Sequence, residues 1–308
     1  MIESIAPTNV CTDRLEALLE HFPVRARLLH AGLLRGIDRV LPPPGGGEIH
    51  LIRGGAADVI LPGRPALRIE VPSLLFFPRP TGRRFVVDTA TDADVVCAEL
   101  LFDSGAANPV VGALPDVVCL PLDALDGTAH LLTLLFDEAF GTNCGRQTLI
   151  DRLFEIVLIQ LLRHLMENDK IGGGMLAGLS HPRLRKALVA MHDAPGQEWP
   201  LEALADAAGM SRSVFAGTFR KVVGCTPGAY LQSWRVKLSQ QALRRGRPLK
   251  LIAHEVGYGS EAALSRAFKA QCGLAPREWR QSENRRETAG DPECAVDRTQ
   301  GRDPVAWI

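Results

Sequence analysis

Apolar residues in the first third of the chain form short runs that are separated by Pro and Gly. Breaks fall at Gly54-Gly55, at Pro62-Gly63 and at Pro72, and the runs between them are rich in Val, Ile, Leu and Phe. Short runs of this composition, closely spaced by turn residues, are typical of β-strands in a small sandwich or barrel. The predicted strands cover residues 49–52, 58–61, 66–71, 74–77, 84–87 and 94–101.

Over residues 128–167 the apolar positions change to helical spacing, which predicts a helix. The stripe consists of Leu149, Leu153, Ile156, Val157, Leu161 and Leu165, with Ile150, Phe154, Leu158 and Leu162 beside it. A stripe this wide exceeds the single buried face of an ordinary surface helix. Two arrangements fit: one side packs on the strands and the other on a second subunit, or the helix is buried within its own domain.

Length and charge divide the chain. Its 308 residues suffice for two domains. The formal net charge is zero, but residues 181–286 hold 18 Lys+Arg against 8 Asp+Glu, which favours a polyanionic partner for that segment. Glycines at 172–174 and 178 predict a flexible linker. We therefore expect a first domain over residues 1–167, a linker over 168–180, a basic domain over 181–281 and a disordered tail over 282–308.

The sequence also indicates the compartment. The longest apolar segment, residues 156–162, is much shorter than the roughly 20 residues that span a bilayer, and no signal-peptide pattern opens the chain. We therefore expect a cytoplasmic protein. The cysteines are odd in number, irregularly spaced and without a CxxC pair, which argues against a disulfide framework and a zinc finger. They are Cys11, Cys97, Cys119, Cys144, Cys225, Cys272 and Cys294.

The basic domain contains an internal repeat. Residues 204–211 read LADAAGMS and residues 252–260 read IAHEVGYGS, an offset of 48 that becomes 49 after Gly259. At the later offset several residue types recur in order, and so many matches at one spacing are not expected by chance. The matching pairs are Phe215 and Leu264, Phe219 and Phe268, Arg220 and Lys269, Gly224 and Gly273, Pro227 and Pro276, and Tyr230 and Trp279.

Each copy of the repeat has the anatomy of a helix-turn-helix unit. A short helix (201–207 and 249–255) ends near Gly209 or Gly257, which can adopt the positive φ of a tight turn. Ser211 or Ser260 then follows as a candidate cap for a second helix. The second helices end at Gly224 and Gly273, and we expect them to turn Val214, Phe215, Thr218 and Phe219, and Ala263, Leu264, Ala267 and Phe268, inward.

A predicted helix over residues 227–245 lies between the two copies, with Pro227 at its start. Eighteen helical residues span about 27 Å. A rod of that length can hold two recognition helices in successive major grooves, which repeat at about 34 Å. The alternative is an ordinary helical domain with a basic surface, but it leaves the repeat and the charge unexplained.

These residues resemble the AraC/XylS family of bacterial transcription regulators. The resemblance covers about residues 181–281 and is strongest at 252–260, at Phe268-Lys269 and at 273–276 (GLAP). It implies a helical DNA-binding domain, promoter DNA and RNA polymerase as partners, and promoter activation. Residues 72–80 (PSLLFFPRP) and 96–98 (VCA) are similar to the cupin-type sensor domain of one branch, which includes reactive-chlorine-responsive regulators. The expected fold is thus α+β, with a cupin-like β-barrel and dimerisation helices before an all-α tandem helix-turn-helix domain.

The resemblance also implies which residues contact DNA. The first recognition helix would present small side chains at several positions, so it can read methyl groups or DNA shape, or contribute little specificity. Arginine can bond guanine and glutamate can bond cytosine, whereas Arg220, Lys221 and Lys269 fit phosphate contacts; Glu261 fits a helix-dipole role equally well. The implied set is Ser211, Arg212, Ser213, Ala216, Gly217, Arg220 and Lys221, with Ser260, Glu261, Ala262, Ser265, Arg266 and Lys269.

The first domain lacks the pattern of a metal cupin, which needs a His-x-His pair, a nearby Glu and a later His. His50 has no His at +2, Glu48 lies two residues before it, and Arg83 or Arg84 stands where the later His is expected. We therefore expect no metal and no cofactor, and a structural or ligand-contacting role for His50.

Cys97 lies in an apolar strand and has two interpretations. It is either a buried small hydrophobe or a redox sensor, which would need exposure and positive charge from Arg83 or Arg84. Cys11 is the candidate partner thiol, and Cys225 and Cys272, near helix ends, are expected to be structural.

Together these features predict a homodimeric, non-enzymatic transcription regulator. Its first domain would receive an oxidant or a small-molecule signal. The alternatives are a cupin-type metalloenzyme fused to a DNA-binding domain, and a structural DNA-binding protein without a signal, which would bind independently of sequence and with a steep salt dependence.

Overall fold

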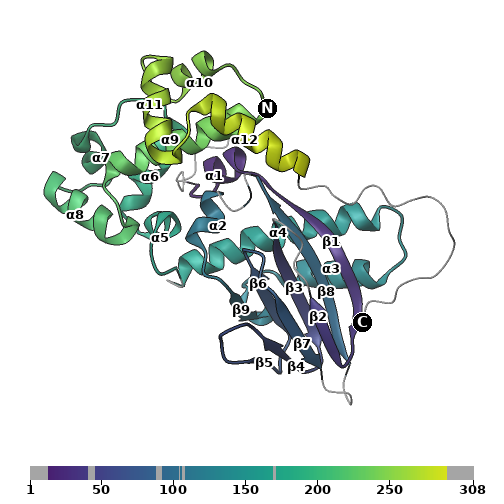
Figure 1. Cartoon of the computed structure of the whole chain (residues 1–308). Helices are drawn as coiled ribbons and strands as arrows, with labels where there is room; N and C mark the ends of the chain where they lie inside the picture. The colour runs from purple at the N-terminus through teal and green to yellow at the C-terminus, as the bar shows by residue number, and fades with distance from the viewer. Residues whose placement is uncertain are drawn as a thin grey trace, which may run out of the picture. The chain divides into compact units, whose positions relative to one another are not determined.

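The computed structural model describes residues 13–40, 46–87, 92–103, 105, 108–168 and 171–289, which fall into two compact units (Figure 1). One unit comprises the described part of residues 22–177 and carries all the described strands. The other comprises residues 13–21 together with residues 178–289 and is helical.

Two antiparallel sheets form the first unit. The strands of the five-stranded sheet are, in spatial order, β1 (Val24–Leu34), β8 (Ala93–Phe102), β3 (Gly47–Gly54), β6 (Ser73–Phe77) and β9 (Val118–Pro121). Those of the four-stranded sheet are β2 (Ile37–Val40), β7 (Arg83–Val87), β4 (Ala57–Ile60) and β5 (Leu67–Ile69). All six predicted strands are present, whereas β1, β2 and β9 were not predicted.

The main core of this unit lies between the two sheets. Ile52, Leu75 and Phe77 from the larger sheet meet Val59 and Phe85 from the smaller one, and all are buried. Alternate residues of a strand point to opposite faces, so every second side chain of β3 and β8 turns away from this core. Most of those side chains are buried as well, so both strands are largely buried on their two faces.

Two helices, α3 (Ala129–Phe140) and α4 (Arg146–Glu167), occupy the region of helical spacing. A short loop separates the two helices, and Gly145 adopts a φ of 79° at the start of α4. Asp151 and Glu155 of α4 accept hydrogen bonds from the backbone N–H groups of Leu28 (2.7 Å) and Ala26 (3.3 Å) in β1. Since β1 is the edge strand of its sheet, α4 satisfies donors that an edge would otherwise leave open.

Most of the wide apolar stripe of α4 is buried within its own unit, because nine of the helix's 22 residues are buried there. Leu149 and Ile156 remain 40% and 44% exposed. Burial within the domain was one of the two arrangements considered from the sequence. It accounts for most of the stripe but not for these two exposed side chains.

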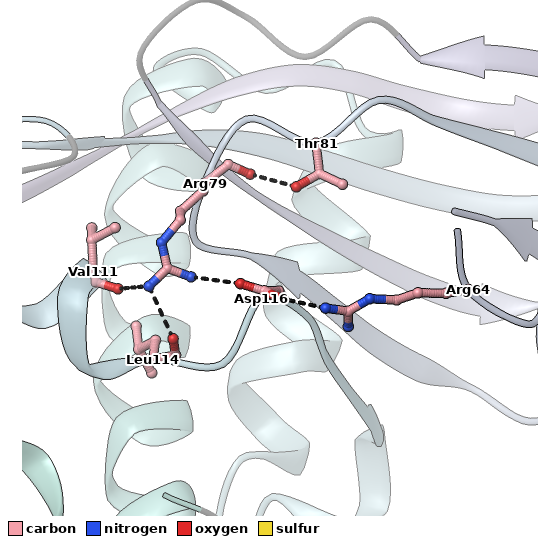
Figure 2. Close-up of polar contacts among 6 residues, drawn as sticks. All are labelled: Arg64, Arg79, Thr81, Val111, Leu114 and Asp116. Carbon is pink, nitrogen blue, oxygen red and sulfur yellow. Dashed lines mark hydrogen bonds and ion pairs between the residues drawn. The ribbon is translucent and has the colours of Figure 1, made fainter. Parts of the chain in front are cut away.

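Arg79, in the middle of the Pro78-Arg79-Pro80 segment, has a structural role (Figure 2). One guanidinium nitrogen donates to the carbonyl oxygens of Val111 (2.7 Å) and Leu114 (3.2 Å), at the end of helix α2 (Pro109–Ala113). The other donates to Asp116 (3.1 Å). Arg79 therefore fastens the loop after β6 to the connection between α2 and β9.

The helical unit contains the basic domain and one segment from far away in the sequence. Helix α1 (Glu16–His21) packs against α6 (Leu184–Asp193). Gln241 donates a hydrogen bond to the carbonyl oxygen of His21, whose ring meets Trp234 edge-on with centroids 6.2 Å apart. This segment was predicted to belong to the first domain, because sequence spacing carries no signal for such a long-range contact.

Two segments expected to lack structure are partly helical. Helix α5 (Met175–Ser180) lies within the predicted linker, where the apolar Met175, Leu176 and Leu179 are buried. Helix α12 (Pro276–Ala289) continues eight residues into the predicted tail, while residues 290–308 lie outside the described residues. No described helix has the length and apolar character needed to cross a membrane.

Candidate nucleic-acid interface

The two copies of the repeat fold as the predicted helix-turn-helix units. They consist of α7 (Leu201–Ala207) with α8 (Arg212–Val223), and of α10 (Leu249–Glu255) with α11 (Glu261–Cys272). Gly209 and Gly257 adopt φ values of 61° and 80°, as predicted for the turns. The N–H that follows each glycine reaches back five residues to a helical carbonyl, at 2.9 Å in the first copy and 2.7 Å in the second.

The ends of the recognition helices α8 and α11 match the expectation in part. Gly224 and Gly273 end them with φ values of 88° and 77°. The Ser260 hydroxyl accepts a hydrogen bond from the Ala263 N–H (3.2 Å) and caps α11. Ser211 occupies the same position before α8, but its side chain makes no capping bond. The predicted cap is therefore confirmed in the second copy only.

The buried faces of α8 and α11 anchor the two recognition helices. Phe215 and Phe219 in α8, and Leu264 and Phe268 in α11, are fully buried as predicted. Val214 was also expected to turn inward, which is wrong, because its side chain is 53% exposed. Buried positions in α8 recur every four residues from Phe215, and Val214 lies about 100° around the helix from that line.

The residues that the family resemblance assigned to DNA lie on the accessible side of both recognition helices. Ala216 and Ser265 are half-buried and all the others are exposed. The exposed ones are Ser211, Arg212, Ser213, Gly217, Arg220 and Lys221 in the first copy, and Ser260, Glu261, Ala262, Arg266 and Lys269 in the second. The first surface offers small side chains in the middle of its helix, whereas the second offers an acid and an arginine.

Helix α9 (Pro227–Arg244) joins the two copies. Thr226 caps it by accepting a hydrogen bond from the Ala229 N–H (3.3 Å), and its apolar side chains, including Trp234 and Leu238, are buried. It packs against α8, which precedes it in the sequence, and against α10, α11 and α12, which follow it. One continuous helix thus carries both recognition helices.

Inside the first unit, Glu48, His50 and Arg83 form a buried polar cluster between the sheets. Arg83 pairs with Glu48, and its guanidinium lies 2.5 Å from Nε2 of His50. Burial, with the nearby charge of Arg83, lowers the pKa of His50 to about 4. Burial alone would raise the pKa of Glu48, but its bond to His50 and the charge of Arg83 outweigh that effect and lower it. The cluster at neutral pH is therefore an ion pair beside a neutral imidazole.

This cluster does not fit a metal ion of the cupin type. Arg83, rather than the exposed Arg84, faces His50 and Glu48, and its guanidinium bonds both candidate ligands. A fixed cation at this place repels a divalent ion and occupies the donor atoms that the ion would need. The described residues contain no group of three His, Cys, Asp or Glu that could hold a metal.

Cys97 faces the same interior. In the sheet it pairs with His50 on one side and with His30 on the other, and directly paired residues share a face. Its side chain is 9% exposed, and it contributes to the electrostatic surroundings of Arg83. The structure therefore places Cys97 near Arg83 but away from solvent.

The other cysteines differ in accessibility. Cys144 is exposed, and Cys119, Cys225 and Cys272 are partly buried. Burial raises the pKa of the thiols of Cys225 and Cys272, which favours the unreactive protonated form. Cys11, the proposed partner of Cys97, and Cys294 lie outside the described residues.

Comparison with known proteins identifies both units. A cupin family model matches residues 13–167, just over half of the chain, and a helix-turn-helix domain model matches residues 204–282. A putative AraC-like transcription regulator from Streptomyces lividans is 37% identical over 183 residues, covering 58% of this chain and 60% of its own length. The chain belongs to the AraC family, in a branch with an N-terminal cupin domain.

Two further relatives of this AraC-family chain are informative. The regulator AlkR of Acinetobacter baylyi is 37% identical over 185 residues, with 58% of this chain and 60% of its own length covered. The RCS-specific transcriptional activator RclR of Escherichia coli is 28% identical over 249 residues, with 78% and 87% covered. The matches to the Streptomyces and Acinetobacter proteins span about 60% of those proteins.

Sequence reasoning missed part of the cupin interior of this AraC-family chain. His30 was not singled out, although its Nε2 is buried without a hydrogen-bond partner among the described residues. Cys119 was counted but not placed at this core, against which it packs. Both lie on β1 or β9, the strands that were not predicted, so no register was available to bring them to this face.

Proposed function

We propose that this protein is a sequence-specific DNA-binding transcription regulator, without enzymatic activity, that activates promoters in the cytoplasm together with RNA polymerase. The observation that carries the proposal is the pair of recognition helices on one connecting helix, each with an exposed polar face, in a segment with 18 Lys+Arg against 8 Asp+Glu. Such a pair is suited to two neighbouring major grooves of one duplex.

Fluorescence anisotropy tests DNA recognition. Labelled DNA from upstream of the gene that encodes this chain is titrated at fixed salt, with random duplex as competitor. We expect specific binding at least about 10³-fold tighter than binding to random DNA. Equal affinity for both, with a steep salt dependence, would instead support a structural DNA-binding protein without a defined operator. Transcription from the same promoter with purified RNA polymerase then tests activation.

Within this proposal, the second recognition helix supplies most of the direct base readout. Arg266 and Glu261 are long polar side chains that reach base edges, whereas Ser213, Ala216 and Gly217 fit shape or methyl readout. Arg266→Ala should weaken specific binding by about 1–3 kcal/mol with little effect on random DNA. A uniform loss on every sequence would reassign Arg266 to the phosphate backbone.

We also propose a homodimer, formed through the helices of the cupin domain. Leu149 and Ile156 lie seven residues apart on α4, thus on one face, and stay 40% and 44% exposed, which favours burial against a second copy. Light scattering should give twice the chain mass for the wild type and the monomer mass for Leu149→Glu with Ile156→Glu. The control is Thr148→Glu, an exposed position on the same helix about 100° around it from Leu149. A monomeric wild type would exclude this dimer.

For the signal, we propose that the cupin domain, with boundaries at about residues 1–167, responds to an oxidant through Cys97 with Cys11 as its partner. The name of the similar RclR protein and the position of Cys97 near Arg83 support this. The low exposure of Cys97 implies that an oxidant reaches it only through a local opening of the sheets.

The test compares promoter affinity of reduced and hypochlorite-treated protein. Oxidation should shift the affinity of the wild type and of Cys144→Ser, which removes an exposed thiol, but not that of Cys97→Ser. If Cys97→Ser still responds, Cys97 is a core residue. If no form responds to oxidant but all bind the promoter, a small organic ligand of the cupin interior becomes the leading signal.

The alternative function, a cupin-type metalloenzyme fused to a DNA-binding domain, is disfavoured by Arg83. Its guanidinium pairs with the Glu48 and His50 that such an enzyme would use as ligands. Elemental analysis of the purified full chain tests this directly. Iron or manganese at one equivalent per chain would support the metalloenzyme alternative.

A further inference from the structure

The two helix-turn-helix halves touch at a backbone contact that involves two glycines. The loop after α6 brings Gly196 against the turn between α10 and α11, at Glu255 and Gly257. A Cβ on Gly196 would lie 2.6 Å from the Glu255 carbonyl oxygen, and one on Gly257 would lie 2.4 Å from the Gly196 carbonyl oxygen. Only glycine at both positions permits so close an approach, since real Cβ atoms are essentially never under 3.0 Å from such atoms.

Arg235, on the connecting helix α9, reinforces this contact from the side. Its Nε donates to the Pro195 carbonyl oxygen (2.7 Å), and its Nη2 donates to the Gln197 carbonyl oxygen (2.8 Å). The same guanidinium lies over the ring of Tyr258, 5.7 Å from its centroid, and would be 2.9 Å from a Cβ on Gly257. One side chain thus contacts both the loop that precedes the first helix-turn-helix unit and the turn of the second helix-turn-helix unit.

The repeat itself shows that this contact is not a requirement of the helix-turn-helix turn. Gly209 is the counterpart of Gly257 at the offset of 48 and has a positive φ as well, 61° against 80°. A Cβ on Gly209 would meet nothing within 4 Å, whereas one on Gly257 would clash. The turn alone explains the positive φ of both glycines, but only the junction explains the close approach at Gly257.

The junction bears on how the two recognition helices are presented to DNA. Helix α9 sets their separation, yet each half also has to keep its orientation on that helix. One base pair displaces the next groove by about 3.4 Å and turns it by roughly 35°, as follows from 10–10.5 base pairs per turn. A helix-turn-helix half that can change its orientation on α9 can follow such a displacement. A half that is also fixed by a second contact, away from α9, cannot.

We propose that Arg235, with the Gly196–Gly257 contact, is a positioning residue that fixes the orientation of the two recognition helices and thereby determines which half-site spacing the protein accepts. This inference rests on the proposed function, because both recognition helices must contact the same duplex. Arg235 itself is not assigned any contact with DNA.

The test measures tolerance to spacing. Full-length protein first selects tight binders from random-sequence duplexes, and base substitutions along a selected duplex locate the two contacted segments. Affinities are then measured by anisotropy for that duplex and for derivatives with one base pair inserted or deleted between the segments. For the wild type we expect each change of spacing to weaken binding roughly tenfold or more, similar to the effect of a mismatched base pair.

Arg235→Ala should reduce that spacing penalty to about threefold or less, while the penalties for base substitutions inside each segment stay as in the wild type. The matched control is Arg244→Ala. Arg244 also lies on α9, pairs with Glu283 and stacks on Trp279 at 4.9 Å, but these partners both belong to the C-terminal half. It should retain the wild-type spacing penalty, although its removal costs comparable contacts.

An unchanged spacing penalty in Arg235→Ala would overturn the inference. So would a spacing penalty that falls by the same factor in Arg244→Ala as in Arg235→Ala. If Arg235→Ala loses its helical circular dichroism, Arg235→Lys replaces it, since lysine keeps the charge but cannot donate to both carbonyls in this geometry. A wild type with no sequence preference refutes the proposed function instead. Substitutions that matter in only one segment refute the inference and leave DNA binding intact.

Discussion

The buried His192 leads to a prediction about the pH dependence of the DNA-binding unit. Its ring is 1% exposed, stacks on Trp234 with centroids 4.0 Å apart, and shares a hydrogen bond of 2.6 Å with the Tyr230 hydroxyl. Burial, with a further contribution from His21, lowers the pKa of His192 to about 3. The folded unit therefore holds this imidazole neutral at pH values where an unfolded chain binds a proton.

The sign and size of this pH effect on the free energy of unfolding follow from proton linkage. Because the folded pKa is depressed below the unfolded value near 6.5, the contribution of His192 to stability is complete above pH 6.5 and decreases as pH falls toward 3. Each pH unit in that window costs about 1.4 kcal/mol. Between pH 8 and pH 5 the helical unit should lose ~2 kcal/mol of unfolding free energy through this residue.

Denaturant unfolding followed by tryptophan fluorescence measures the effect. Trp199, Trp234 and Trp279 all belong to the helical unit, so a Trp307→Phe background makes the signal specific for it. His192→Gln should be less stable than the wild type at pH 8, because it loses the ring stack, but it should lose about 2 kcal/mol less on going to pH 5. The exposed His254→Gln serves as the matched control.

Neighbouring groups set the range of the experiment. Burial also lowers the pKa of His21, which acts in the same direction, and raises the pKa of Asp193, which acts in the opposite one at lower pH. Staying at or above pH 5 keeps the Asp193 effect small. If the wild type and His192→Gln lose equal free energy between pH 8 and pH 5, the ring is hydrated in the folded chain and the reasoning fails.

Three other changes test the structure. Glu48→Gln leaves the charge of Arg83 buried and unpaired, and should cost roughly 3–5 kcal/mol in the thermal or denaturant unfolding of the cupin unit; a loss below about 1 kcal/mol would show that water reaches the pair. Gly257→Ala should destabilise the helical unit by about 1–3 kcal/mol more than Gly209→Ala, since both strain a positive φ but only the first also clashes. Arg220→Ala should weaken binding to all duplexes alike and reduce the slope of log affinity against log salt by about 1, which an unchanged slope would contradict.

The fold was predictable where the signal is local. The tandem helix-turn-helix units follow from glycines that need a positive φ and from apolar positions four residues apart, such as Phe215 and Phe219, and these features survive any change of surroundings. The central strands of the cupin unit were predictable because burial on both faces makes β6 and most of β8 apolar, although β3 also carries the buried Glu48 and His50. Strand β1 escaped detection because it lies at a sheet edge and mixes exposed Arg25 and Arg27 with buried Ala26.

What could not be predicted depends on contacts between distant segments. The sequence offered Arg83 and Arg84 equally, and only the alternation of β7 opposite β3 shows that Arg83 faces His50. Likewise, the ring of His21 contacts that of Trp234, which lies 213 positions later in the chain, and no local periodicity indicates this contact. Pairings of this kind decide which polar side chains are buried together, and so they decide the chemistry of the core.

The two copies of the repeat differ in the recognition surfaces that they present. Two copies that share their turns and buried faces would be expected to have equivalent recognition surfaces, yet Ala216 and Gly217 stand where the second copy has Ser265 and Arg266. Arginine can hydrogen-bond a base edge, whereas alanine and glycine offer the bases no side-chain hydrogen bond. A weakly discriminating half is still useful if it is rigidly joined to a discriminating one, because it then adds phosphate contacts only at the correct distance. In that case the Arg235 junction turns nonspecific affinity in one half into a requirement for spacing, and the two features depend on each other.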